Sequence, residues 1–185
     1  MGMPLEPWVT LTTELIVDNR WVRVRRDSAR LPSGLLVPDY YYWDGGDFTQ
    51  VFAVTTAGEV VLVRQYKYPP RQVTLELPAG SIDPEDADPL AGAKRELREE
   101  TGYGGGDWRP LGALHTSPGK ANTRSYAYLA TGVTRLGDPQ PDATEDIEVV
   151  KVPMPDILDH MTNGGGVDSN ALAACLLALR ALRLV

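Results

Sequence analysis

A helical pattern in the middle of the chain lies between two series of strand patterns, and this change of hydrophobic period constrains the fold more than any other feature. Residues 89–101 repeat apolar side chains at helical spacing. Asp88 precedes them as an N-cap acceptor, proline follows at the first helical position, and Gly102 is a natural stop. Because strand patterns lie on both sides of this helix, the sequence predicts an α/β fold.

The strand patterns suggest a chain with two parts. They cover residues 22–25, 35–43, 48–56, 59–68 and 73–77 before the helix, and 108–115, 123–132 and 145–152 after it. A short helix is predicted near 156–161, a loop at 163–166 and a final helix from Ser169 to about Leu182. The strand-rich region 1–46 precedes the first tight hairpin and predicts a separate small antiparallel sheet. Residues 47–185 are predicted to form the main domain.

Composition excludes several classes of function. A net charge of −7 argues against a nucleic-acid partner, which needs a basic face. No apolar run approaches the roughly 18 residues of a membrane-spanning helix, and the N-terminus lacks the profile of a signal peptide. Cys175 is the single cysteine, so no intramolecular disulfide forms and a cytoplasmic location is expected.

The predicted helix carries an unusual cluster of acids. Glu96, Glu99 and Glu100 stand at i, i+3 and i+4, so they share one face near the helix C-terminus. Like charges at this spacing repel, and the helix dipole disfavours negative charge at this end. A solvated acidic face paired with arginines is the alternative. A hard divalent cation explains the cluster better, because carboxylate oxygens are the ligands that Mg²⁺ prefers.

A strand end and a glycine lie just upstream of these acids. Gly80, in Pro78-Ala79-Gly80, lets the backbone bend and approach a ligand closely. A strand, a glycine loop and an acidic helix together predict a cradle for a metal ion and phosphate.

These segments resemble the Nudix box, in which glycine, five residues, Glu and seven residues precede Arg-Glu, two residues, Glu-Glu, one residue and Gly. Arg95 to Tyr103 match the second half, while the first half has one extra residue, so that Glu85 or Asp86 stands in for the first Glu. The resemblance implies an α/β/α sandwich around a mixed β-sheet. It also implies a metal site, for Mg²⁺ or alternatively Mn²⁺. Its implied ligands and helpers are Glu96, Glu100, Glu99, the backbone carbonyl of Ala79, and Arg95, which orients the acids.

The flanks of the box are similar to those of ADP-ribose pyrophosphatases. Residues 63–69 and 75–80 carry the resemblance, and Pro118 stands where this subclass has a marker proline, although a turn proline is the alternative. The resemblance implies Mg²⁺-dependent hydrolysis of the diphosphate of a nucleoside diphosphate sugar, with ADP-ribose giving AMP and ribose 5-phosphate. GDP-mannose or another sugar nucleotide is an alternative substrate, and a nucleotide-binding sensor without catalysis is an alternative function.

The same resemblance suggests roles outside the box. Glu145 is the candidate general base, with Asp146 and Glu148 as rivals, and an ordinary solvated acidic loop is the alternative. Trp21 and Tyr40 or Tyr41 are candidates for stacking on adenine, and Arg64 or Lys67 for neutralising phosphate. Exchange of N-terminal strands between two subunits implies a homodimer.

Overall fold

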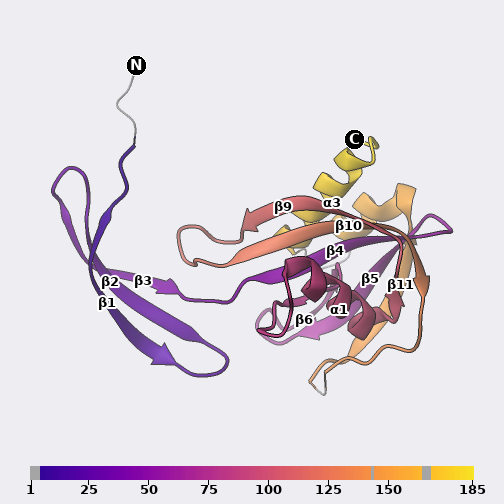
Figure 1. Cartoon of the computed structure of the whole chain (residues 1–185), viewed down its shortest axis with the longest axis horizontal. Coiled ribbons are helices and arrows are strands. Elements are labelled where there is room, and N and C mark those ends of the chain that lie inside the picture. The colour runs from indigo at the N-terminus through magenta and orange to yellow at the C-terminus, as the bar shows by residue number, and fades with distance from the viewer. Residues whose placement is uncertain (1–4, 143, 164–167) are drawn as a thin grey trace. The chain divides into compact units, whose positions relative to one another are not determined.

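The chain separates into two compact units. The computed structural model describes residues 5–142, 144–163 and 168–185, so the predicted loop at 163–166 lies largely outside the described residues. The smaller unit runs up to Gly46 and includes residues 115–123, and the larger unit contains residues 47–114 and 124–185. Figure 1 shows the elements of both.

The smaller unit is a three-stranded antiparallel sheet. Its strands β1 (Val9–Asp18), β2 (Arg23–Arg30) and β3 (Leu36–Trp43) follow one another in space as in sequence. Residues 115–123, which the sequence analysis assigned to the main domain, join this unit. The reason is a long-range backbone contact, in which the Trp43 N–H donates to the Lys120 carbonyl at 2.8 Å.

The larger unit is built on an eight-stranded mixed sheet. Its main path runs β11-β5-β4-β10-β8, in which β4 and β10 are parallel and the other pairs are antiparallel. β6, β7 and β9 pair with β5, β4 and β10 respectively. The strands are β4 (Phe48–Thr55), β5 (Glu59–Lys67), β6 (Gln72–Glu76), β7 (Ala79–Ser81), β8 (Tyr103–Gly104), β9 (Asp107–His115), β10 (Arg124–Arg135) and β11 (Ile147–Pro153).

Helices cover both faces of this sheet. The strand β4 alternates, so that Val51 and Ala53 pack against α1 (Pro89–Thr101) while Phe52 and Val54 pack on the other face. That other face is covered by α2 (Ile157–Asn163) and α3 (Ser169–Ala181), with a short 3-10 turn, Met154–Asp156, before α2. The α/β/α sandwich and the additional N-terminal antiparallel sheet are therefore confirmed. No helix in the described part of the chain is long and apolar enough to cross a membrane.

Most predicted elements are present, and the helix at 89–101 has the predicted bounds. The strand β1 was not predicted from the sequence, and all ten of its residues are exposed. The buried Cys175 lies in α3 within the core between that helix and the sheet, as a small apolar side chain does.

Candidate active site

The helix α1 holds the acids in defined positions because both of its ends are capped. The Asp88 side chain accepts from the Ala91 N–H at 2.8 Å, and Gly102 adopts a left-handed conformation with φ 74° at the C-cap. Leu97 faces the sheet and is fully buried. Glu100 lies beside this buried face and is 1% exposed. A carboxylate so deeply buried needs specific partners.

The strand β7 supplies these partners. The Ala79 N–H donates to Oε2 of Glu100 at 2.9 Å. Gly80 lies directly over the carboxyl group of Glu96, so closely that a Cβ atom at this position would overlap it. A side chain at position 80 would therefore displace the Glu96 carboxyl group from its place against the backbone. The predicted cradle of strand, glycine and acidic helix is present in the structure.

Burial and mutual repulsion make these acids reluctant to ionise. Burial, together with the charges of Glu96 and Glu145, raises the pKa of Glu100 to about 8 against the opposing Ala79 hydrogen bond. Burial also raises the pKa of Glu96, whose nearby acids include Glu99 and Glu145. Glu145, from the loop before β11, therefore acts electrostatically on both helix carboxylates. A divalent cation among these acids would remove the repulsion that they now feel.

Arg95 connects the helix to the loop that follows β7. Its guanidinium donates to Glu96 at 2.8 Å, to Glu99 at 3.0 Å and to the Ser81 carbonyl at 2.9 Å. It also forms two hydrogen bonds with Asp86, at 3.2 and 2.9 Å. Glu99 is thus turned toward Arg95.

Asp86 is the acid that stands in for the missing first Glu of the motif. Arg95 lowers the pKa of Asp86 by hydrogen bonding, whereas Glu85 is exposed. Asp83 adds an ion pair with Arg95 at 3.2 Å, a contact that the sequence analysis missed. A signal for this arrangement exists in Gly92, because a glycine inside a helix costs stability. A Cβ atom there would lie 2.9 Å from Oδ2 of Asp86, so Gly92 makes room for the shorter acid.

The donor set fits a hard divalent cation. Glu100 presents a buried carboxylate and Glu96 a half-buried one beside the Ala79–Gly80 backbone, and oxygen ligands of this kind suit Mg²⁺ or Mn²⁺. Across residues 5–142, 144–163 and 168–185, no three His, Cys, Asp or Glu side chains already converge as a metal site. Arg95 holds both Glu96 and Glu99 toward its guanidinium by hydrogen bonds.

Arg64 lies away from these acids. On β5 it shares its face with Leu62, which packs on the α2 and α3 side of the sheet, and it forms an ion pair with Glu148 of β11. Glu148 is thereby on the face opposite α1, unlike Glu145. Lys67 lies three residues after Arg64 on β5, so its side chain is on the opposite face of the sheet, where it forms an ion pair with Glu76 at 3.3 Å. The structure therefore brings Lys67, and not Arg64, to the acidic face.

The other candidate substrate contacts all belong to the smaller unit. Trp21 is 69% exposed, with the Arg20 guanidinium over its ring at 4.2 Å. The Tyr40 ring packs edge-on against Trp8, and its hydroxyl donates to the Gly119 carbonyl at 3.2 Å. Pro118 lies in the segment 115–123 that joins this unit. The aromatic partner of Tyr40 is thus Trp8 rather than Trp21.

Comparison with known families agrees with this geometry. The NUDIX domain family matches residues 49–173, and the nucleoside diphosphate sugar hydrolase N-terminal domain family matches residues 8–43. The chain belongs to the Nudix family and is a hydrolase of that family. Enzymes of this family generally depend on divalent metal ions.

Individual relatives and a solved structure give more specific similarities than the family matches. The chain is 31% identical over 168 residues to the ADP-ribose pyrophosphatase of Mycobacterium tuberculosis, which covers 90% of this chain and 81% of the relative. It is 30% identical over 166 residues to the methanol dehydrogenase activator of Bacillus methanolicus, covering 89% of each. A crystal structure of an ADP compounds hydrolase shares the fold, with a TM-score of 0.81 at 21% identity over 98% of this chain and 97% of that one.

Proposed function

We propose that this protein hydrolyses the diphosphate bond of a nucleoside diphosphate sugar in a reaction that depends on Mg²⁺, with ADP-ribose as the preferred substrate. The buried Glu100 and the half-buried Glu96 beside Gly80 are the observation that carries this proposal. The similarity to an ADP-ribose pyrophosphatase supports the choice of substrate. The products would be AMP and ribose 5-phosphate.

The roles of the acidic residues follow from their surroundings. Glu96, Glu100 and the carbonyl of Ala79 would hold the cation, with Glu99 joining them when it leaves Arg95. When bound, a divalent ion neutralises diphosphate charge and lowers the pKa of coordinated water. Arg95 fixes the position of Glu96 through its hydrogen bond and ties the helix to Asp86. Gly80 keeps the space above Glu96 free of side-chain atoms.

Glu145 is our candidate for the general base. It lies close enough to raise the pKa values of Glu96 and Glu100, and the Asp142 N–H donates to its carboxylate at 3.1 Å. Among the described residues no other hydrogen bond reaches this carboxylate, and a base so lightly held is free to approach a water molecule when substrate binds. Glu148 is occupied by Arg64 on the other face.

A set of three variants tests this assignment of the base. Glu145→Gln should lower kcat far more than Asp146→Asn or Glu148→Gln, and it should flatten the acidic limb of the pH–rate profile. Equal losses in Glu145→Gln and Asp146→Asn would show that the loop acts through its total charge and not through one base.

The smaller unit is proposed to bind the nucleoside and to form a homodimer. Trp21 and Tyr40 are the candidates for stacking on adenine, with Pro118 in the adjacent segment, while Lys67 is better placed than Arg64 to meet phosphate. Large apolar side chains are exposed across this sheet, which is typical of an interaction surface. They include Val9, Leu11, Leu15, Ile16, Val17, Leu36, Tyr41 and Trp43. Burial of the sole cysteine, Cys175, fits a cytoplasmic enzyme.

A substrate panel tests the proposed reaction. The purified protein is assayed with Mg²⁺ or Mn²⁺ against ADP-ribose, GDP-mannose, UDP-glucose, NADH and a diadenosine polyphosphate, with direct detection of the monophosphate. Preference for ADP-ribose supports the proposal. Preference for GDP-mannose would support diphosphate hydrolysis but contradict the proposed contacts to adenine. Tight binding without turnover would identify a nucleotide sensor.

A further inference from the structure

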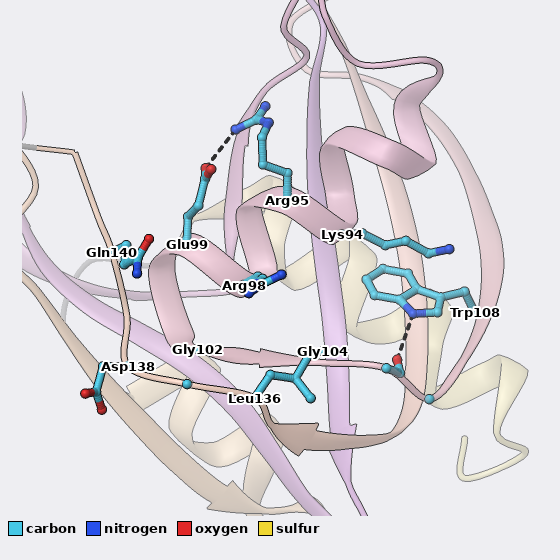
Figure 2. A pocket seen from close by; sticks show the side chains of 13 residues that line it. Lys94, Arg95, Arg98, Glu99, Gly102, Gly104, Trp108, Leu136, Asp138 and Gln140 are labelled. Carbon is cyan, nitrogen blue, oxygen red and sulfur yellow. Dashed lines mark hydrogen bonds and ion pairs between the residues drawn. The ribbon is translucent and has the colours of Figure 1, made fainter.

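A cavity adjoins the proposed active site along α1, and Arg95 and Glu99 belong to both. Its volume is about 660 Å³, which is within the size range of small-molecule sites. One wall is α1 with Lys94 and Arg98, a second is the glycine run before Trp108, and residues 136–140 close it. Figure 2 shows Lys94 and Arg98 projecting from the helix toward the Trp108 side of the cavity.

The lining of this cavity is positive in a chain that is negative overall. The net charge of the protein is −7, yet three cations line the cavity against two carboxylates. Both carboxylates are already in ion pairs, Glu99 with Arg95 and Asp138 with Arg135. Among the described residues, Lys94 and Arg98 have no acidic partner.

Stabilisation of the helix terminus does not account for these two cations. Cations near a helix C-terminus often compensate its exposed carbonyls. Here the backbone already does so, because the Gln140 N–H donates to the Glu99 carbonyl at 2.7 Å and the Gly102 N–H to the Arg98 carbonyl at 2.8 Å. The Leu136 N–H donates to the Gly102 carbonyl at 2.8 Å. The charges of Lys94 and Arg98 are therefore available to a ligand.

Trp108 gives the cavity an aromatic wall in a fixed orientation. Its indole N–H donates to the Gly105 carbonyl at 2.9 Å, and its ring packs edge-on against Tyr128. The Lys94 ammonium lies 5.8 Å from the ring centroid, so the cation that would meet an anion is next to the ring that would meet a base. The wall beside Leu136 is closely packed, because Gly104 is buried and a Cβ atom there would lie only 2.8 Å from Leu136.

We propose that this cavity is a second ligand site, which binds a nucleoside monophosphate with its phosphate on Lys94 and Arg98 and its base on Trp108. Two cations without an acidic partner among the described residues, beside an aromatic ring, match this ligand better than a bare phosphate or a sugar phosphate, because those leave the ring unused. The proposed reaction also releases a nucleoside monophosphate, so an activity assay would not separate this site from the active site. The test therefore measures binding of the nucleotide.

The test is calorimetric titration of the full-length protein with AMP in the presence of EDTA, which removes divalent ions from the acidic site. The double variant Lys94→Gln, Arg98→Gln should weaken AMP binding by at least about tenfold, since each lost contact involves a charged donor. Both side chains are exposed, so the variant should unfold at the wild-type temperature. Arg180→Gln is the matched control, because Arg180 is also a basic residue in the last turn of a 13-residue helix.

The AMP affinities of the variants decide whether the cavity is a ligand site. Loss of AMP affinity in the double variant, with wild-type affinity in Arg180→Gln, supports the site. Unchanged AMP affinity in the double variant overturns it, whether or not the protein hydrolyses ADP-ribose. Titrations with inorganic phosphate and ribose 5-phosphate test the aromatic wall, and affinities equal to that of AMP would overturn the assignment of a nucleotide.

Discussion

The two units of this chain place their apolar side chains in opposite ways. In the larger unit Phe52 and Leu62 are fully buried between the sheet and the helices α2 and α3. In the smaller unit every residue of β1 is exposed, Leu15 and Val17 among them. The larger unit thus has a core of its own and contains the acidic site. The smaller unit instead exposes an apolar surface, which is available to a binding partner such as a second subunit. Burial in one unit and exposure in the other suggest a division between chemistry and recognition.

Matched leucine substitutions test this contrast most directly. Leu62→Ala should lower the free energy of unfolding by about 2–5 kcal/mol, because it leaves a cavity in a fully buried core. Leu15→Ala removes a side chain that is 39% exposed, and in the isolated subunit it should cost less than about 1 kcal/mol. Urea unfolding measures both values.

Analytical ultracentrifugation then distinguishes a role of Leu15 in self-association from its role in the stability of the subunit. If the exposed sheet is a dimer surface, Leu15→Ala should weaken self-association while Leu62→Ala does not. A wild-type association constant in Leu15→Ala would break the comparison, because the apolar surface would then have no measurable partner.

Glu100→Gln tests whether the larger unit alone provides the chemistry. The substitution removes a buried carboxylate that we assign to the metal, and kcat/KM at limiting Mg²⁺ should fall by roughly 10²–10³-fold. Glu85→Gln is the control, since Glu85 is an exposed acid just before the same helix. Retention of full activity by Glu100→Gln would remove this residue from the proposed site.

Gly80→Ala should have a smaller effect on the same reaction. The added methyl group would overlap the carboxyl group of Glu96 and displace it, and we expect a loss in kcat/KM of about 10–100-fold, as for changes that disturb a metal ligand indirectly. Gly46→Ala is the control, because a Cβ atom there meets nothing within 4 Å. Equal activities of the two variants would show that close approach at Gly80 is not needed.

The acidic helix could be predicted from the sequence because its information is local. Caps, period and the spacing of its acids all lie within residues 88–102, and the structure keeps those bounds. The partner of Arg95 was left open between Glu85 and Asp86, since the choice depends on the shape of a loop with one extra residue. Only the packed structure shows that Gly92 makes room for Asp86.

Other features depend on contacts between distant parts of the chain. The alternation of β5 tells that Arg64 and Lys67 differ in face, but not which face carries α1. The place of residues 115–123 follows from hydrogen bonds with Trp43, which have no local signature. The strand β1 is different, because the alternation of Val9, Leu11, Leu15 and Val17 with polar residues is a local pattern that the sequence analysis overlooked.

The pH dependence of stability probes the buried acids of the larger unit. Burial raises the pKa of Glu100 from 4.5 to about 8, so between these values the folded state keeps a proton that the unfolded chain has lost. The metal-free protein should therefore lose stability as pH rises through this window, by at most about 1.4 kcal/mol per pH unit from this residue. The lowered pKa of Asp86 acts below its ordinary value of 3.8 and lies outside the window.

Urea unfolding in EDTA at several pH values from 5 to 8 measures this slope as a difference between wild type and Glu100→Gln. The variant should show a shallower decline, and it should be the more stable protein at the upper end of the range. Parallel curves for the two proteins would mean that Glu100 is not ionising against its buried surroundings.

Arg64→Ala should have the smallest effect and tests how sharply the chemistry is confined. Its ion pair with Glu148 is about half exposed, so its loss should cost less than about 1 kcal/mol of stability. Because Arg64 faces α2 and α3, kcat/KM for ADP-ribose should stay within about twofold of wild type. Lys67→Ala, on the acidic face of the same strand, should raise KM instead. A large loss in Arg64→Ala would place substrate contacts of the larger unit outside its acidic face, and the chemistry would then not be confined to the α1 side of the sheet.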